Sequence, residues 1–235
     1  LGTVDGAVVL TGQCFWGDCG SIFWRNMVGP PVHGIQSSDL ETWSPVMWRL
    51  KDLDDRVPID TEIRSTPGGA EVWYYGTPAG QMGDPAAFEQ PHNIYSARVE
   101  GDTLVDPVVR MTAPHLADPA PLRFGDKQLV FLTVKPGHEV GVAMGEPLRV
   151  VHTWRGVSVP HAMVVDGVIW AWAQRVEAGR FVPVRSTSRD GVNWSPWQAV
   201  LPTADRSCAN PVGTVFASQP VVFCVEEPVP TLVAP

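Results

Sequence analysis

The chain has 235 residues, of which 44% are hydrophobic and 18% charged, and its formal net charge is −8. The apolar and aromatic content excludes a disordered chain, and the acidic balance without any Lys or Arg run argues against a nucleic-acid partner. The 22 glycines and 23 prolines are spread along the whole chain, which disfavours a helical bundle. No apolar stretch is long enough for a membrane span, and we expect one all-β domain over residues 1–235.

The cysteines fall into two local pairs, Cys14 with Cys19 and Cys208 with Cys224. Neither spacing suits a CxxC zinc or redox site, so we predict two disulfides. Disulfides persist in oxidising compartments, so we expect a secreted or periplasmic protein, whose leader is not present in a chain that begins at Leu1. The alternative is four buried free thiols.

A nine-residue motif occurs twice, at residues 37–45 and 188–196, and both copies read S-x-D-x-x-x-W-S-P. Ser and Asp side chains accept hydrogen bonds from nearby backbone amides and so stabilise turns. Strand-like segments flank each copy. The motif therefore predicts two similar hairpins, with the Trp packed beneath each turn.

Apolar strands recur along the chain and start near residues 7, 71, 128, 168 and 220. Several of these strands follow a short Pro-containing segment, and a turn signal separates that segment from the strand. The spacing of about 40 to 65 residues matches the four-stranded blades of a β-propeller. The pattern predicts about twenty short strands and no long helix.

These repeats resemble the five-bladed β-propellers of the glycoside hydrolase superfamily that includes arabinanases, β-xylosidases and levansucrases. The two S-x-D-x-x-x-W-S-P segments resemble the Asp box of sialidases. The resemblance implies a five-bladed β-propeller whose innermost strands line a central funnel. We expect one blade to be incomplete, or latched by the residues that follow Val225.

The resemblance implies acidic residues on the innermost strands. Asp60 and Asp118 are the candidates that match by position, and Glu62 is a further acid two residues beyond Asp60. Glycoside cleavage needs one carboxylic acid as proton donor and one carboxylate as base or nucleophile. We expect the first-blade acid of the family to precede the start of this sequence. The family's Glu-Gly-Pro motif has only Gly145-Glu146-Pro147 as its nearest counterpart.

Two readings of these residues stay open. Asp60 and Asp118 would be catalytic in a hydrolase, and the same funnel would bind a glycan or small molecule without turnover in a lectin-like protein. The alternative role of both residues is turn-capping. Exposed Trp16 and Trp24 would bind the sugar by stacking, together with Arg64, whereas the other tryptophans would pack between blades.

The histidines suggest a competing metal site. His33, His115 and His161 lie at or near the predicted entries of strands, and His92 is a fourth candidate. A propeller could bring them together to bind Zn²⁺ or Cu²⁺, and Ca²⁺ is a further possibility. The glycan-active reading requires no cofactor, and in it these histidines are structural. The sequence does not define an oligomeric state.

Overall fold

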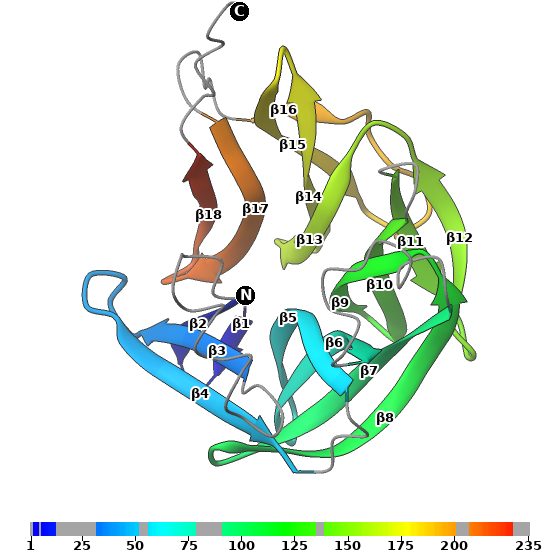
Figure 1. The fold of residues 1–235 in the computed structure, drawn as a ribbon. Coiled ribbons are helices and arrows are strands. Elements are labelled where there is room, and N and C mark those ends of the chain that lie inside the picture. The colour runs from blue at the N-terminus through cyan, green and yellow to red at the C-terminus, as the bar shows by residue number, and fades with distance from the viewer. Residues whose placement is uncertain are drawn as a thin grey trace, which may run out of the picture. The chain divides into compact units, whose positions relative to one another are not determined.

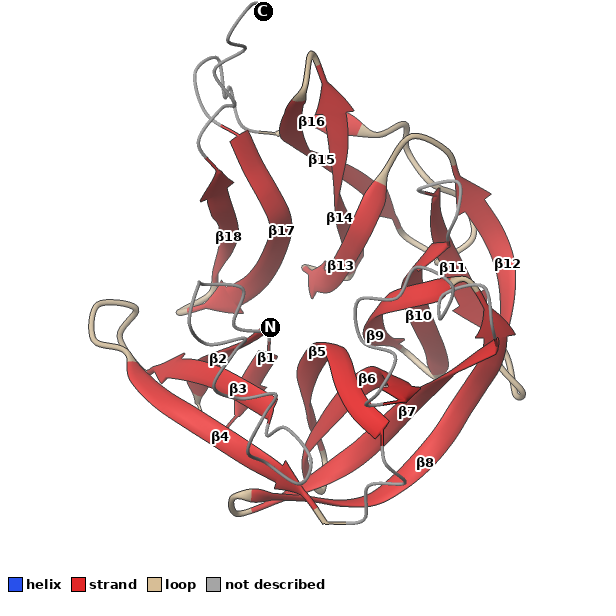
Figure 2. Cartoon of the chain, in the orientation of Figure 1, coloured by secondary structure: helices blue, strands red, loops and turns tan. Residues whose placement is uncertain are grey.

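The computed structural model describes residues 2–4, 6–12, 32–51, 56–78, 91–134, 139–200 and 207–227. These residues form eighteen strands joined by turns and bends, as Figure 2 shows. No helix able to cross a membrane is found among them. The chain divides into two compact units, residues 1–121 and 122–235. The all-β prediction, with about twenty short strands, is confirmed.

The first unit contains two four-stranded antiparallel sheets (Figure 1). The first sheet consists of β1 (Gly2–Val4), β2 (Ala7–Gly12), β3 (Val32–Ser37) and β4 (Ser44–Leu50). The second consists of β5 (Arg56–Thr66), β6 (Gly69–Pro78), β7 (Pro91–Glu100) and β8 (Thr103–Pro114). Because β4 pairs in parallel with β8 at Arg49↔Thr103 and Leu50↔Leu104, the two form one eight-stranded sheet.

The N-terminal residues form an edge strand of the first sheet, since β1 pairs with β2 and ends the strand order. The residues expected to latch this blade include 228–235, which lie outside the described part of the chain.

The core of the first unit joins both sheets. It contains Val9, Val32 and Trp48 of the first sheet and Ile63, Val72, Tyr74, Ala97 and Leu104 of the second. Tyr74 stacks on Tyr95 with ring centroids 5.3 Å apart.

The remaining strands form three antiparallel sheets. One contains β9 (Leu116–Phe124), whose first residues belong to the first unit, with β10 (Lys127–Val134), β11 (Glu139–Met144) and β12 (Arg149–Trp154). The next contains β13 (Ser158–Val165), β14 (Val168–Glu177), β15 (Arg180–Ser188) and β16 (Gln198–Ala199), and the last contains β17 (Ser207–Phe216) and β18 (Gln219–Glu227). The five predicted apolar strands are thus β2, β6, β10, β14 and β18.

Both predicted hairpins have the same hydrogen-bond pattern. Asp39 Oδ1 accepts from the amides of Glu41 and Thr42 at 2.8 Å each, and Ser37 Oγ accepts from the amide of Leu40 at 2.8 Å. In the second copy, Asp190 Oδ1 accepts from the amides of Val192 and Asn193 at 2.8 Å, and Ser188 Oγ accepts from Gly191 at 2.9 Å. The capping role that the motif predicts is confirmed.

The tryptophan of the second hairpin lies in an aromatic cluster of the second unit. Trp194 makes edge-to-face contacts with Phe131 and Trp154, at centroid distances of 5.5 and 5.4 Å. Trp154 also contacts Trp197 at 5.7 Å. Edge-to-face geometry is favourable for aromatic pairs, so buried Phe131 and the half-buried tryptophans hold the hairpin against β10 and β12.

A disulfide joins Cys208 of β17 to Cys224 of β18, with Cα atoms 5.4 Å apart. One of the two predicted disulfides is therefore confirmed. Cys14 and Cys19 lie outside the described residues.

Candidate functional site

The first strand of four sheets contains one non-glycine residue with a left-handed backbone. These residues are Asp60 of β5, Asp118 of β9, Val159 of β13 and Asn210 of β17, with φ of 48°, 50°, 53° and 50°. The strand register shifts across three of these positions, between residues 59 and 62, 158 and 161, and 209 and 212. Left-handed backbone in a non-glycine residue costs free energy, and such strain concentrates at functional sites.

Polar side chains on the second strands hold these kinks in place. Thr133 Oγ1 of β10 accepts a hydrogen bond of 2.8 Å from the amide of Val159. Gln174 Oε1 of β14 accepts one of 2.7 Å from the amide of Asn210. In the first unit, Thr11 Oγ1 of β2 donates to the carbonyl of Thr61, next to Asp60, at 2.6 Å. Each side chain thus reaches from one sheet to the first strand of the next.

Tyr75 of β6 contacts Asp60 and lies within reach of the charge of Asp118. It is buried, and its phenol shares a hydrogen bond with the Asp60 side chain. Burial, followed by the negative charges of Asp60 and Asp118, raises the pKa of Tyr75 far above its ordinary value. Tyr75 is therefore a neutral phenol that donates to Asp60. The first unit brings Asp60, Asp118 and Tyr75 together.

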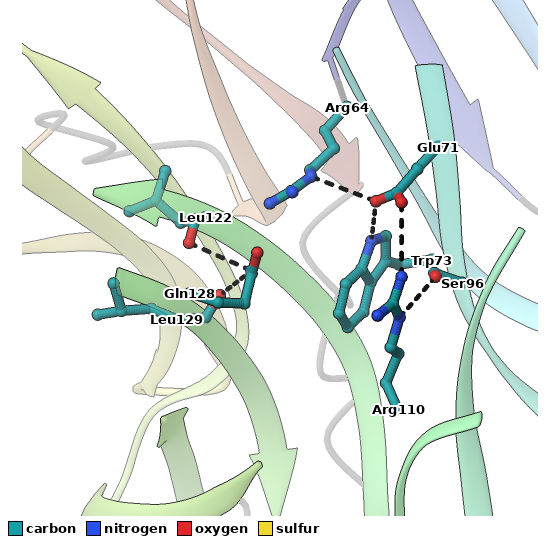
Figure 3. A network of polar contacts seen from close by, with 8 residues as sticks. All are labelled: Arg64, Glu71, Trp73, Ser96, Arg110, Leu122, Gln128 and Leu129. Carbon is teal, nitrogen blue, oxygen red and sulfur yellow. Dashed lines mark hydrogen bonds and ion pairs between the residues drawn. The ribbon is translucent and has the colours of Figure 1, made fainter. Parts of the chain in front are cut away.

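Arg64, a predicted sugar ligand, belongs to a polar network on one face of the second sheet (Figure 3). Its Nε lies 3.6 Å from Glu71 Oε2, and Arg110 Nη2 lies 3.5 Å from Glu71 Oε1. Trp73 Nε1 donates to Glu71 Oε2 at 3.2 Å, and both guanidinium groups lie within 6.0 Å of its ring centroid. Arg110 Nε donates to Ser96 Oγ at 2.8 Å.

Glu62 is half-buried and lies opposite Trp73 in the register of β5 and β6. Since the register shifts between Ile59 and Glu62, a spacing of two residues does not by itself place Glu62 on the face of Asp60. Glu146, the nearest counterpart of the Glu-Gly-Pro motif, is exposed in the turn between β11 and β12.

The predicted histidine site falls partly outside the described part of the chain, because the side chains of His33 and His92 are not among those described. Among the described residues, no three His, Cys, Asp or Glu side chains are placed to hold one metal ion. His161 is buried, and its Nδ1 accepts a hydrogen bond of 3.2 Å from the amide of Gly213. His115 is half-buried in the turn between β8 and β9, with φ of 61°. His33 and His92 lie in β3 and β7.

Two predicted sugar ligands, Trp16 and Trp24, lie outside the described residues. Tyr75 is a site residue that the sequence interpretation missed. The signal that could have found it is a polar side chain near the end of an apolar strand, since Thr11, Thr133 and Gln174 occupy such places on β2, β10 and β14.

No protein-family model matches this sequence, and it matches no curated protein. Solved structures do resemble it. An exo-β-1,3-galactanase from Phanerochaete chrysosporium, determined with β-1,3-galactotriose, matches with a TM-score of 0.65 and 11% identity, over 94% of this chain and 54% of its own. An α-L-arabinofuranosidase from Lactobacillus brevis matches with a TM-score of 0.60 and 12% identity, over 95% and 81% of the two chains.

A GH32 β-fructofuranosidase from Bombyx mori, determined with sucrose, matches with a TM-score of 0.65 and 12% identity, over 94% of this chain and 52% of its own. This chain spans about half the length of the galactanase and the fructofuranosidase. These likenesses show that the chain has the all-β, five-bladed β-propeller fold of these glycoside hydrolases.

Proposed function

We propose that this protein is exported and binds glycans through Asp60 and Asp118. The observation that carries the proposal is the placement of both carboxylates on kinked, left-handed positions of successive first strands, beside one neutral phenol. Both are half-buried, so a ligand can reach them. Carboxylate oxygens accept hydrogen bonds from sugar hydroxyls. The disulfide between Cys208 and Cys224 supports an oxidising compartment.

The fold supports the choice of ligand class. The galactanase structure contains β-1,3-galactotriose and the fructofuranosidase structure contains sucrose, so the similar proteins bind oligosaccharides. By analogy of fold, an oligosaccharide is the first ligand to test here.

Hydrolysis is the second candidate, and the pairing of two carboxylates favours it. In such a reaction Asp60 would act as base or as electrostatic partner, Asp118 as the second carboxylate, and Glu62 as the weakest candidate for the acid. Tyr75 stays protonated and therefore would not act as a base.

The experiment is a panel of oligosaccharides and aryl glycosides, assayed for binding by calorimetry and for released sugar. We expect Asp60→Asn and Asp118→Asn each to weaken binding at least tenfold. Asp166→Asn is the matched control, because Asp166 is an exposed, left-handed aspartate in the turn between β13 and β14. Binding that is equal in all three variants would exclude the assigned site, and binding without released sugar would exclude hydrolysis.

A further inference from the structure

The position of Tyr75 in its sheet is equivalent to that of Gln174 in another sheet. Tyr75 pairs with Ile59, the residue before left-handed Asp60, and Gln174 pairs with Ser158, the residue before left-handed Val159. The two side chains thus occupy the same place on the second strand of their sheets.

Gln174 shows what this place does. Its Oε1 holds the amide of Asn210, the left-handed residue on the first strand of the following sheet. The corresponding residue for Tyr75 is Asp118, the left-handed residue on β9. The charge of Asp118 acts on Tyr75, as does the charge of Asp60, which lies on the sheet of Tyr75 itself.

The residue type differs for a chemical reason. Gln174 Oε1 and Thr133 Oγ1 face backbone amides and act as acceptors. The groups near Tyr75 are instead the carboxylates of Asp60 and Asp118, which accept hydrogen bonds. They therefore need a donor, and the phenol hydroxyl supplies one on a rigid ring. Tyr75 is 2% exposed, so its ring is packed by its surroundings, and its hydroxyl is hydrogen-bonded to the Asp60 side chain.

We propose that Tyr75 is the positioning residue of the site, whose buried hydroxyl orients the Asp60 carboxylate within reach of the charge of Asp118. The effect of Tyr75 on glycan binding rests on the proposed function. The hydrogen bond between Tyr75 and Asp60 does not, because it exists whether or not a glycan binds. In a glycan-binding protein, the donated hydrogen bond favours the ionised Asp60, which is the form that accepts sugar hydroxyls.

The contact can be tested without any ligand. The chain has only three tyrosines, so protein labelled with ¹³C at the tyrosine ζ carbon gives three resonances. Tyr75→Phe and Tyr95→Phe assign them by loss of a peak. We expect the Tyr75 resonance to move in Asp60→Asn and in Asp118→Asn, while the Tyr95 resonance stays in place. A Tyr75 resonance that is unchanged in both variants overturns the proposal.

The consequence is tested by the pH dependence of oligosaccharide binding. Loss of the donor in Tyr75→Phe should move the acid limb of the binding profile upward by roughly half to one pH unit. A residue with a merely structural role would weaken binding by the same factor at every pH, and that result overturns the positioning role. If no oligosaccharide binds while the Tyr75 resonance still responds to both aspartates, the proposed function fails and the contact stands.

Discussion

Gln174 Oε1 accepts a hydrogen bond of 2.7 Å from the backbone amide of Asn210, so a buried side chain of β14 holds the kink in β17. The two residues are 36 positions apart in the chain. A long-range contact of this kind helps to fix the left-handed backbone of Asn210, which has a φ of 50°.

Replacing Gln174 with methionine should therefore destabilise the protein. Gln174→Met keeps the length of the side chain but removes the acceptor, which leaves the Asn210 amide without this partner. We expect the free energy of unfolding to fall by about 1–3 kcal/mol, measured by urea denaturation. Gln198→Met, at an exposed position of β16, is the control and should change it little. Equal stability of the two variants would contradict the clamping role of Gln174.

The two hairpins that resemble Asp boxes, at residues 37–45 and 188–196, differ at one strained position. Leu40 has a φ of 65°, and its counterpart Gly191 has a φ of 77°. We expect Leu40→Gly to be neutral or to stabilise by up to about 1 kcal/mol, because relief of left-handed strain offsets the added freedom of the unfolded chain. Thermal denaturation measures the effect.

The reciprocal substitution Gly191→Ala should destabilise by about 1–2 kcal/mol in the same assay. A Cβ atom at Gly191 would also come within 3.1 Å of Leu129 Cδ2. A gain in stability for this variant, or a clear loss for Leu40→Gly, would show that backbone strain does not govern these turns.

The Asp boxes predict a loss of stability in acid. Hydrogen bonds from the amides of Thr42 and Glu41, and then from Ser37, lower the pKa of Asp39 from 3.8 to about 2. The pKa of Asp190 is lowered for the same reason. Because the folded pKa lies below the unfolded one, this contribution is complete above pH 3.8 and is lost as the pH falls toward 2.

Asp39→Asn tests this contribution, because the amide side chain cannot ionise. The difference in melting temperature between the parent protein and Asp39→Asn should be largest above pH 4 and should narrow as the pH falls toward 2. A difference that stays constant over this range would exclude the Asp39 carboxylate as its source.

The disulfide between β17 and β18 should contribute to stability. Its half-cystines are 16 residues apart, and closing a loop of that length constrains the unfolded chain by about 3 kcal/mol. We expect the double variant Cys208→Ala, Cys224→Ala to have a free energy of unfolding lower by about 2–4 kcal/mol. Chemical denaturation without reductant measures it, and an unchanged midpoint would refute the prediction.

Strand positions and hairpins were predictable from the sequence because they depend on local patterns. The five apolar strands begin within about two residues of the predicted positions, since each contains a short run of apolar residues next to a turn signal. The Asp boxes were predictable because the Ser and Asp side chains bond amides only two or three residues away.

The site was less predictable because it depends on contacts between distant segments. The kink at Asp60 changes the register of side chains along β5, and alternation along a strand does not anticipate it. Arg64 reads as a sugar ligand in isolation, but Glu71 and Trp73 of the adjacent strand engage it. Tyr75 reads as one apolar residue of a strand, and its role emerges only beside Asp60.

The parallel pairing of β4 with β8 covers part of the exposed edge of two sheets in the first unit. The amide of Arg49 donates to the carbonyl of Asp102 at 2.8 Å, and that of Lys51 to Leu104 at 3.1 Å. Outermost strands normally expose hydrogen-bonding groups that can recruit a strand from another molecule. Here the edges of two sheets pair with each other at Arg49 and Leu50, so the backbone groups at these positions are not available to a strand from another molecule.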